Sequence, residues 1–193
     1  MDYHQSMGVL AGIVSLAGFA PYCAAILSRG AAPCRSTWAI WTLVGAMLCA
    51  SYWGGGARET IWVALSYVAG PLVVAILSLR FGTGGASLLD RLCLLVSAGS
   101  AVVWAATGEP ILALLLNILV DAAGAVPTIV KAWRDPDSED RTAWRLFLTA
   151  AALNLLALRD WDLSAVSYPA YLFCVAATVV ALSSRHPPGV VRR

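Results

Sequence analysis

Charged residues divide this sequence into apolar stretches that are long enough to cross a lipid bilayer as helices. Seven such stretches cover roughly residues 7–28, 36–54, 60–80, 89–107, 110–132, 142–158 and 164–184. A bilayer core is about 30 Å thick and needs about 20 apolar residues of helix to cross it. Backbone amides in lipid must bond within the segment, so we expect helices and not strands.

The composition predicts lipid as the main solvent of the chain. Sixty per cent of the residues are hydrophobic and only 12% are charged, whereas about 25% of a soluble domain is charged. So few charges cannot cover a surface that faces water. We therefore expect an all-α integral membrane protein, multi-pass in the plasma or inner membrane, with the lipid bilayer as a partner and no nucleic acid.

The basic residues predict the orientation of the chain. Eleven of the 13 follow the first, third, fifth and seventh stretches, and only Arg58 and Arg159 lie in the other connections. Positively charged loops stay in the cytoplasm, which puts the N-terminus outside and the C-terminus in the cytoplasm. The tryptophans fall near the ends of the stretches, where we expect them to anchor the protein in the membrane interfaces, with contact to a substrate as the alternative. They are Trp38, Trp41, Trp53, Trp62, Trp104, Trp133, Trp144 and Trp161.

Residues typical of metal and catalytic sites are few and scattered. His4 and His186 lie at opposite ends of the chain, and the five cysteines show no paired spacing. This pattern favours small apolar roles for the cysteines over a disulfide framework or a metal site. We expect no metal, no cofactor and no enzymatic activity.

A shift of 106 residues partly superimposes the sequence on itself. The matches are Leu10 with Leu116, Val14 with Val120, Ala17-Gly18 with Ala123-Gly124, Pro21 with Pro127, Arg35 with Arg141, Trp38 with Trp144 and Trp41 with Phe147. In the third and seventh stretches the offset becomes 101, where Ser66-Tyr67 meets Ser167-Tyr168. We therefore predict two helix triplets, in residues 1–84 and 109–193, joined by a linker span in residues 85–108. The linker returns the chain to its starting side, which makes the repeat parallel.

These motifs resemble those of the SWEET and PQ-loop transporters. The first copy comprises Gly18-Phe19-Ala20-Pro21-Tyr22, Ile26-Leu27-Ser28-Arg29, Arg35-Ser36-Thr37-Trp38-Ala39-Ile40-Trp41 and Tyr52-Trp53-Gly54; a weaker second copy runs from Gly124-Ala125-Val126-Pro127 to Arg141-Thr142-Ala143-Trp144. The resemblance implies seven spans in a three-plus-one-plus-three arrangement with an external N-terminus. The sequence departs from the family in having Tyr22 and Thr128 after the two prolines. Tyr67 and Tyr168 stand where sugar-transporting members place asparagines that hold the sugar.

Asp121 is the most informative single residue. It lies about eleven residues into the fifth stretch, close to the bilayer midplane, where an acidic residue costs roughly 2.5–3.5 kcal/mol. Such a carboxyl faces a cavity or a partner. It is interpreted either as a proton-coupling or substrate-binding group, or as a carboxyl bonded to a neighbouring helix.

Further polar residues are predicted to gather around Asp121 in the outer half of the bundle. Asn117 precedes it by four residues on the same helical face, and Asn154, Tyr67 and Tyr168 lie at similar depth. Each is a candidate for substrate binding, and each is also interpretable as a polar contact between helices. Cys49 completes the candidate set.

Pro21 and Pro127 occupy matching positions in the first and fifth stretches. A proline removes one helical hydrogen bond and kinks the helix. The pair is predicted to form hinges between the repeats, with static kinks as the alternative.

The resemblance implies a transporter that moves a small polar solute, sugar-like or another small metabolite, by alternating access between the two repeats. Two alternatives stay open: a ligand-binding receptor or interaction protein of the same fold, and a vitamin-precursor transporter. The sequence leaves open the identity of the substrate, its coupling to protons and the formation of a homo-oligomer.

Overall fold

The fold is that of a computed structural model, which describes residues 2–28, 30–31, 33, 35–54, 61–82 and 110–185, with single positions in between (88, 91–92, 95, 99, 102–103 and 106–107). The regular elements in these residues are all helical. They are α1 (Tyr3–Leu27), α2 (Arg35–Gly54), α3 (Ile61–Phe81), α5 (Pro110–Arg134), the 3₁₀ turn η1 (Pro136–Ser138), α6 (Arg141–Leu156) and α7 (Leu163–Ser183).

The helices begin and end within a few residues of the predicted spans. Four of them contain a segment long and apolar enough to cross a membrane, namely α1, α3, α7 and residues Leu114–Arg134 of α5. The apolar part of α2, Thr37–Met47, is shorter. The predicted fourth span lies outside the described residues apart from isolated positions. The described chain is thus a helical protein with four helices suited to a membrane.

Acidic residues cap several helix starts. Asp140 precedes α6 and accepts a hydrogen bond from the backbone N–H of Ala143 at 2.7 Å. Asp162 does the same for α7 through the N–H of Ala165 at 2.9 Å. Hydrogen bonds from the Ser164 hydroxyl and the Ala165 N–H hold the pKa of Asp162 below its usual value. Each cap satisfies an amide that has no partner within its helix.

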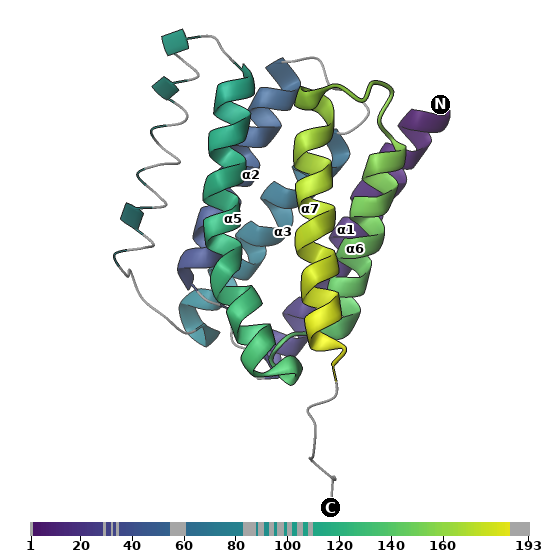
Figure 1. The fold of residues 1–193 in the computed structure, drawn as a ribbon. Coiled ribbons are helices and arrows are strands. Elements are labelled where there is room, and N and C mark those ends of the chain that lie inside the picture. Colours follow the sequence, from purple (N-terminus) through teal and green to yellow (C-terminus); the bar gives the residue numbers. More distant parts are fainter. Residues whose placement is uncertain are drawn as a thin grey trace, which may run out of the picture.

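The six α-helices of the described residues form a ring (Figure 1). Going round it, α1 packs against α3, α3 against α2, α2 against α5, α5 against α7, α7 against α6, and α6 against α1. Exchanging α1 with α5, α2 with α6 and α3 with α7 converts this set of contacts into itself. We call α1, α2 and α3 the first triplet, and α5, α6 and α7 the second triplet.

Two glycines mark the contacts between the triplets. A Cβ added at Gly18 of α1 would lie 2.6 Å from Phe147 Cε1 and 3.3 Å from Leu146 Cβ, both of α6. A Cβ added at Gly124 of α5 would lie 3.3 Å from Nε1 of Trp41 and near Ile40, both of α2. These partners are related by the same 106-residue offset as the two glycines. The repeat found in the sequence therefore corresponds to equivalent contacts in space.

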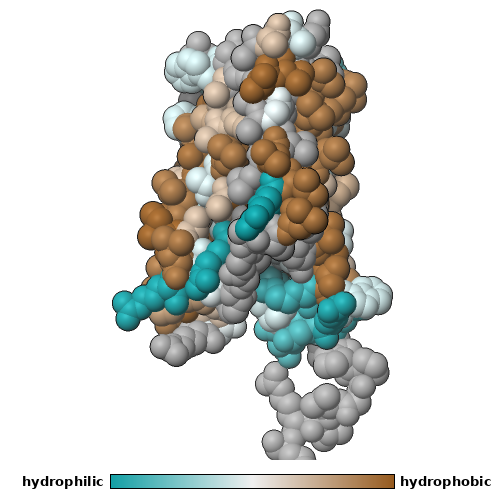
Figure 2. Space-filling view, turned by 90° about the vertical axis from the view of Figure 1, so that its left-hand side faces the viewer, coloured by the Kyte–Doolittle hydropathy of each residue, from teal (hydrophilic) through white to brown (hydrophobic). Residues whose placement is uncertain are grey.

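The outer surface of the ring is largely hydrophobic. Large apolar side chains on α1, α3 and α5 are exposed, among them Ile13 (59%), Ile76 (60%) and Leu119 (63%). On the face shown in Figure 2, hydrophobic side chains cover the flank of the bundle, and most hydrophilic ones lie toward its lower end. An apolar flank of this kind fits a lipid environment.

Basic residues lie at the end of the bundle where α1, α3, α5 and α7 finish. Arg35 donates to the carbonyl oxygen of Ser78 at 3.0 Å, and Arg185 donates to that of Trp133 at 3.1 Å. Both arginines thus satisfy carbonyls at helix C-termini, where a cation is favoured. At the opposite end, Asp2 pairs with Arg159.

Candidate functional site

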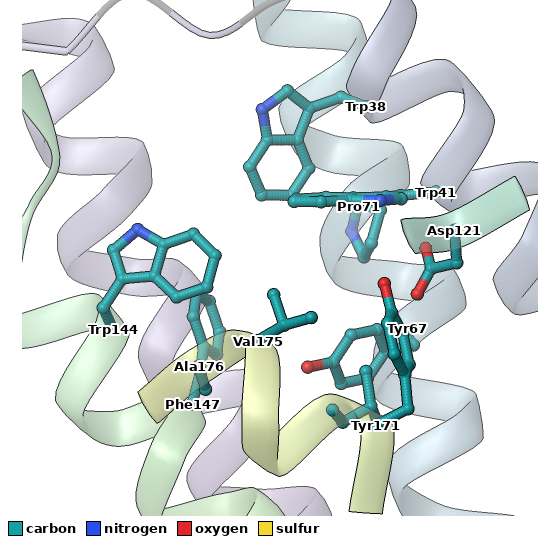
Figure 3. Close-up of a pocket in the computed structure, with 11 residues that line it drawn as sticks. Trp38, Trp41, Tyr67, Pro71, Asp121, Trp144, Phe147, Tyr171, Val175 and Ala176 are labelled. Atoms are coloured by element: carbon teal, nitrogen blue, oxygen red, sulfur yellow. The ribbon is translucent and has the colours of Figure 1, made fainter. Parts of the chain in front are cut away.

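A small cavity lies inside the ring of helices and is lined by α2, α3, α5, α6 and α7 (Figure 3). Its lining residues are Trp38, Trp41, Tyr67, Pro71, Asp121, Trp144, Phe147, Tyr171, Leu172, Val175 and Ala176. The cavity has a volume of about 30 Å³. A water molecule needs roughly 10–15 Å³, so this conformation has room for water, and the walls must move apart to admit a larger ligand.

Equivalent positions of the two triplets line the cavity. The pairs are Trp38 with Trp144, Trp41 with Phe147 and Pro71 with Leu172. The aromatic pairs also share their geometry. The Trp38 and Trp41 rings meet edge to face at 5.0 Å and 82°, and the Trp144 and Phe147 rings do so at 5.7 Å and 85°. Each triplet thus contributes a T-shaped aromatic pair, an arrangement that aromatic rings favour.

The indole N–H groups of two cavity tryptophans are bonded to residues outside the lining. Trp144 donates to Oε2 of Glu139 at 3.0 Å, and Glu139 forms a salt bridge with Lys131 at 2.7 Å. Trp38 is hydrogen-bonded to Tyr22; an indole can only donate, so the phenol oxygen accepts. These bonds fix both rings, which contribute mainly hydrocarbon to the cavity.

The third cavity tryptophan keeps a free donor. The buried Nε1 of Trp41 has no hydrogen-bond partner. It lies beside Gly124, which follows Asp121 by three residues and therefore shares its face of α5. An unpaired buried donor costs about 1–3 kcal/mol. Trp41 therefore brings an unpaired N–H group to the wall of the cavity.

Asp121 is the one carboxyl-bearing residue among the described residues that line the cavity. The residue is only 5% exposed and is hydrogen-bonded to the hydroxyl of Tyr171. Tyr67 of α3 lies close enough to interact electrostatically with it, and Figure 3 shows both tyrosines on the same side of the cavity as Asp121. Among the lining residues that the structure describes, no Lys, Arg or His accompanies the carboxyl.

Two of the six predicted binding residues, Asp121 and Tyr67, line the cavity. Asn117 and Asn154 are both 2% exposed, but neither belongs to the lining. Oδ1 of Asn154 has no hydrogen-bond partner, whereas Asn117 interacts with another residue. The two asparagines are therefore buried polar residues that are not part of the cavity wall.

Tyr168 and Cys49 also lie outside the cavity lining. Tyr168 is 3% exposed, and its ring centroid lies 5.9 Å from that of Tyr171. It therefore packs behind a tyrosine that does reach the cavity. Cys49 is a half-buried free thiol on α2.

The predicted hinge residues lie in α1 and α5. Pro21 lies inside α1, one turn beyond Gly18 at the contact between the triplets. Helix α5 continues through position 127, but the side chain of Pro127 lies outside the described part of the chain. The hinge stays a prediction.

The prediction that all the tryptophans anchor the protein in the membrane interfaces is wrong for the cavity tryptophans. Trp38 and Trp144 are only 4% and 5% exposed, and Trp41 lines the cavity with them. Position near a helix end does not determine which face a residue occupies, and these three lie on inward faces. Four other tryptophans are exposed, as an interfacial role requires; they are Trp53, Trp62, Trp133 and Trp161. Trp104 lies outside the described residues.

Sequence reasoning also missed Tyr171 as a binding residue. It follows Tyr168 by three residues and so lies one turn along the same face of α7. Its equivalent in the first triplet is Gly70, so a comparison of the two repeats for identical residues does not find Tyr171. The tryptophan matches at the 106-residue offset were a usable signal for the aromatic wall, because lipid-facing anchors need not repeat.

The described residues contain no group of three or more His, Cys, Asp or Glu side chains that could hold a metal ion. Comparison with protein-family models, curated proteins and solved structures found no match. The function must therefore be inferred from the cavity.

Proposed function

We propose that the chain is a seven-span membrane transporter that carries a small solute through the central cavity. In this proposal the two triplets flank a linker span in residues 85–108, as in SWEET-like proteins, with the N-terminus outside and the C-terminus in the cytoplasm. The observation that carries the proposal is the lining of one cavity by equivalent positions of both triplets. Transporters built from repeats bind their substrate at such an interface.

The packing on either side of the cavity supports alternating access. One buried cluster includes Ile26 and Val179, near the ends of α1 and α7 that carry the basic residues. A second cluster includes Ala11 and Val63, near the opposite ends of α1 and α3. Rocking the two triplets against each other would open either cluster while the other stays closed. In this proposal the small cavity belongs to the state in which both clusters are closed.

The contacts between the triplets suit such a movement. Gly18 lets α1 approach Phe147 of α6, and Gly124 lets α5 approach Trp41 of α2. Small residues allow close helix packing in membranes. Phe147 and Trp41 belong to the cavity wall as well, so a shift at either contact would change the shape of the substrate site.

A pair of adjacent substitutions tests the proposal. Val175 of α7 lines the cavity, whereas the neighbouring Cys174 is exposed on the outer surface. In proteoliposomes, the wild type should take up at least one solute from a panel of radiolabelled sugars, amino acids, vitamin precursors and small amines. Val175→Phe should block this uptake by filling the cavity, and Cys174→Phe should leave it unchanged.

Two results would count against transport through this cavity. Absence of flux for every solute of the panel would contradict the proposal directly. Equal flux in both phenylalanine variants would separate transport from this cavity. A solute that binds in a Val175-dependent manner without crossing the membrane would instead support a receptor of the same fold.

A further inference from the structure

The cavity combines one carboxyl with a wall of aromatic rings, and this combination selects among ligand classes. Asp121 and the hydroxyls of Tyr67 and Tyr171 occupy one side. The T-shaped pairs Trp38–Trp41 and Trp144–Phe147 supply most of the remaining ring surface. A carboxylate attracts a positive charge, and the faces of aromatic rings attract it as well.

The charge balance of the cavity points to a single positive charge. An unpaired carboxylate in an apolar cavity is costly, so without a counter-ion the carboxyl keeps its proton. The groups that face Asp121 from α3 and α7 are Tyr67 and Tyr171, and from α2 the uncharged Trp41. Lys131, the next cation along α5, is paired with Glu139. A monovalent cation is therefore the ligand charge that Asp121 can balance.

The hydrogen-bonding groups of the cavity disfavour a sugar. The indole N–H groups of Trp38 and Trp144 are bonded outside the lining, so the polar groups left are Asp121, two phenol hydroxyls and the N–H of Trp41. A sugar carries a polar group on nearly every carbon and would leave several of them unpaired. Each buried unpaired polar group costs about 1–3 kcal/mol. A ligand with one polar end and a hydrocarbon body fits better.

We infer that the cavity binds a small monovalent organic cation, whose charged group pairs with Asp121 while its hydrocarbon lies among the aromatic rings. The inference rests on the proposed function, because it assigns a substrate class to the same cavity. When the cation enters, the Asp121 carboxyl releases its proton to water, and when the cation leaves, a proton returns. The site is electrically neutral in both states, so one cation exchanges for one proton.

Two isosteric probes test the substrate class on the wild-type protein. Choline carries a quaternary ammonium, and 3,3-dimethylbutan-1-ol has nearly the same shape without the charge. Binding is measured in lipid nanodiscs by the intrinsic fluorescence of the cavity tryptophans. Choline should bind at least about tenfold more tightly than the alcohol. Choline affinity should fall as the pH is lowered, because protons compete for the same carboxyl. Equal affinity for both probes would overturn the inference.

Variants at equivalent positions of the two triplets locate the charge. Asp121→Asn should abolish the preference for choline over the alcohol and remove its pH dependence. Ser15→Ala is the matched control, because Ser15 is the equivalent of Asp121 in α1 and is bonded to Ser66 outside the cavity. If Asp121→Asn fails to fold, Asp121→Glu keeps the charge and should retain the choline preference. Choline preference in a folded Asp121→Asn protein would contradict the assignment.

The inference and the proposed function fail in different ways. Choline binding without flux of choline or of any solute of the panel in proteoliposomes would leave the cation site standing and remove transport. Flux of a neutral solute, with choline neither binding nor competing, would keep transport and remove the cation site. Proton release on choline binding, followed with a pH-sensitive dye in weak buffer, should be present in the wild type and absent in Asp121→Asn.

Discussion

Ser15 of α1 and Asp121 of α5 occupy equivalent positions in the two triplets, and their surroundings differ. Ser15 is fully buried and accepts a hydrogen bond from the hydroxyl of Ser66 at 2.7 Å. Asp121 lines the cavity and is bonded to Tyr171. The first triplet uses this position to join two of its own helices, whereas the second presents it to the cavity. The two triplets share the packing of their helices, but the carboxyl that lines the cavity comes from the second triplet.

A second difference concerns side-chain volume. In the first triplet the large Phe19 packs against Gly70, where an added Cβ would lie 2.2 Å from the ring. The equivalent positions of the second triplet hold Ala125 and Tyr171. The large side chain therefore lies on α1 in the first triplet and on α7 in the second. The exchange puts a tyrosine hydroxyl beside Asp121. A mismatch between the repeats thus supplies polar groups to the cavity.

A third difference lies in how the matched tryptophans are held. Trp38 is bonded to the neutral Tyr22, and Trp144 is bonded to Glu139, whose partner is Lys131. Hydrogen bonds to charged groups are about twice as strong as neutral ones. The Trp144 ring is therefore held more firmly than the Trp38 ring, and we expect the first triplet to be the more adaptable wall of the cavity.

The largest expected effect is the difference between substituting Asp121 and substituting its equivalent, Ser15. Asp121→Asn should reduce uptake driven by a pH gradient to the background of empty proteoliposomes, because an amide neither carries the exchanged proton nor balances a cation. Ser15→Ala should keep at least about half of the wild-type rate, since its loss is one net hydrogen bond of roughly 1 kcal/mol away from the cavity. Unchanged driven uptake in Asp121→Asn would remove the coupling role and with it the functional asymmetry of the triplets.

The next effect tests the unequal support of the two tryptophans. Lys131→Met leaves the Glu139 carboxylate, whose side chain is 1% exposed, without its cation. The loss of stability should be about 2 kcal/mol. This is less than the roughly 3–5 kcal/mol lost when a fully buried pair is broken, because Lys131 is partly exposed. Tyr22→Phe removes the neutral acceptor of Trp38 and should cost roughly 1 kcal/mol. Thermal unfolding in detergent, followed by tryptophan fluorescence, shows which of the two variants loses more stability. A larger loss of stability in Tyr22→Phe would indicate that the Trp38 ring is held more firmly than the Trp144 ring.

The two interface glycines should also respond unequally. Gly18→Ala would place its Cβ 2.6 Å from Phe147, and such overpacking costs about 1–3 kcal/mol; we expect about 1.5. Gly124→Ala would place its Cβ 3.3 Å from the nearest atom, a contact that a slight shift relieves. The higher helix propensity of alanine offsets this cost by up to about 1 kcal/mol. Equal unfolding temperatures for the two variants would show that the α1–α6 and α2–α5 contacts are equally tight.

The positions of the described helices could be predicted from the sequence because apolar length leaves a signal along the chain, as for α1 and α7. The shared offset also indicated that Gly18 and Gly124 are equivalent positions, and each lies in a close contact between helices. The inward faces were not predictable in the same way. In lipid both faces of a helix are apolar, so hydrophobic periodicity does not separate Trp38 from the exposed Trp133. Asp121 was found because a carboxyl in a span must face inward.

The smallest expected effect concerns the start of α6. Asp140 caps this helix through the N–H of Ala143, while the sequence has Cys34 at the equivalent position of the first triplet. Asp140→Ala should lower stability by about 1 kcal/mol, the usual cost of losing a cap. Asp140→Asn keeps the accepting oxygen and should restore most of that loss in the same thermal assay. If Asn is as destabilising as Ala, the charge at the helix start stabilises α6 and not the capping bond, and the second triplet would then differ from the first in electrostatics at this end of the bundle as well as in the cavity.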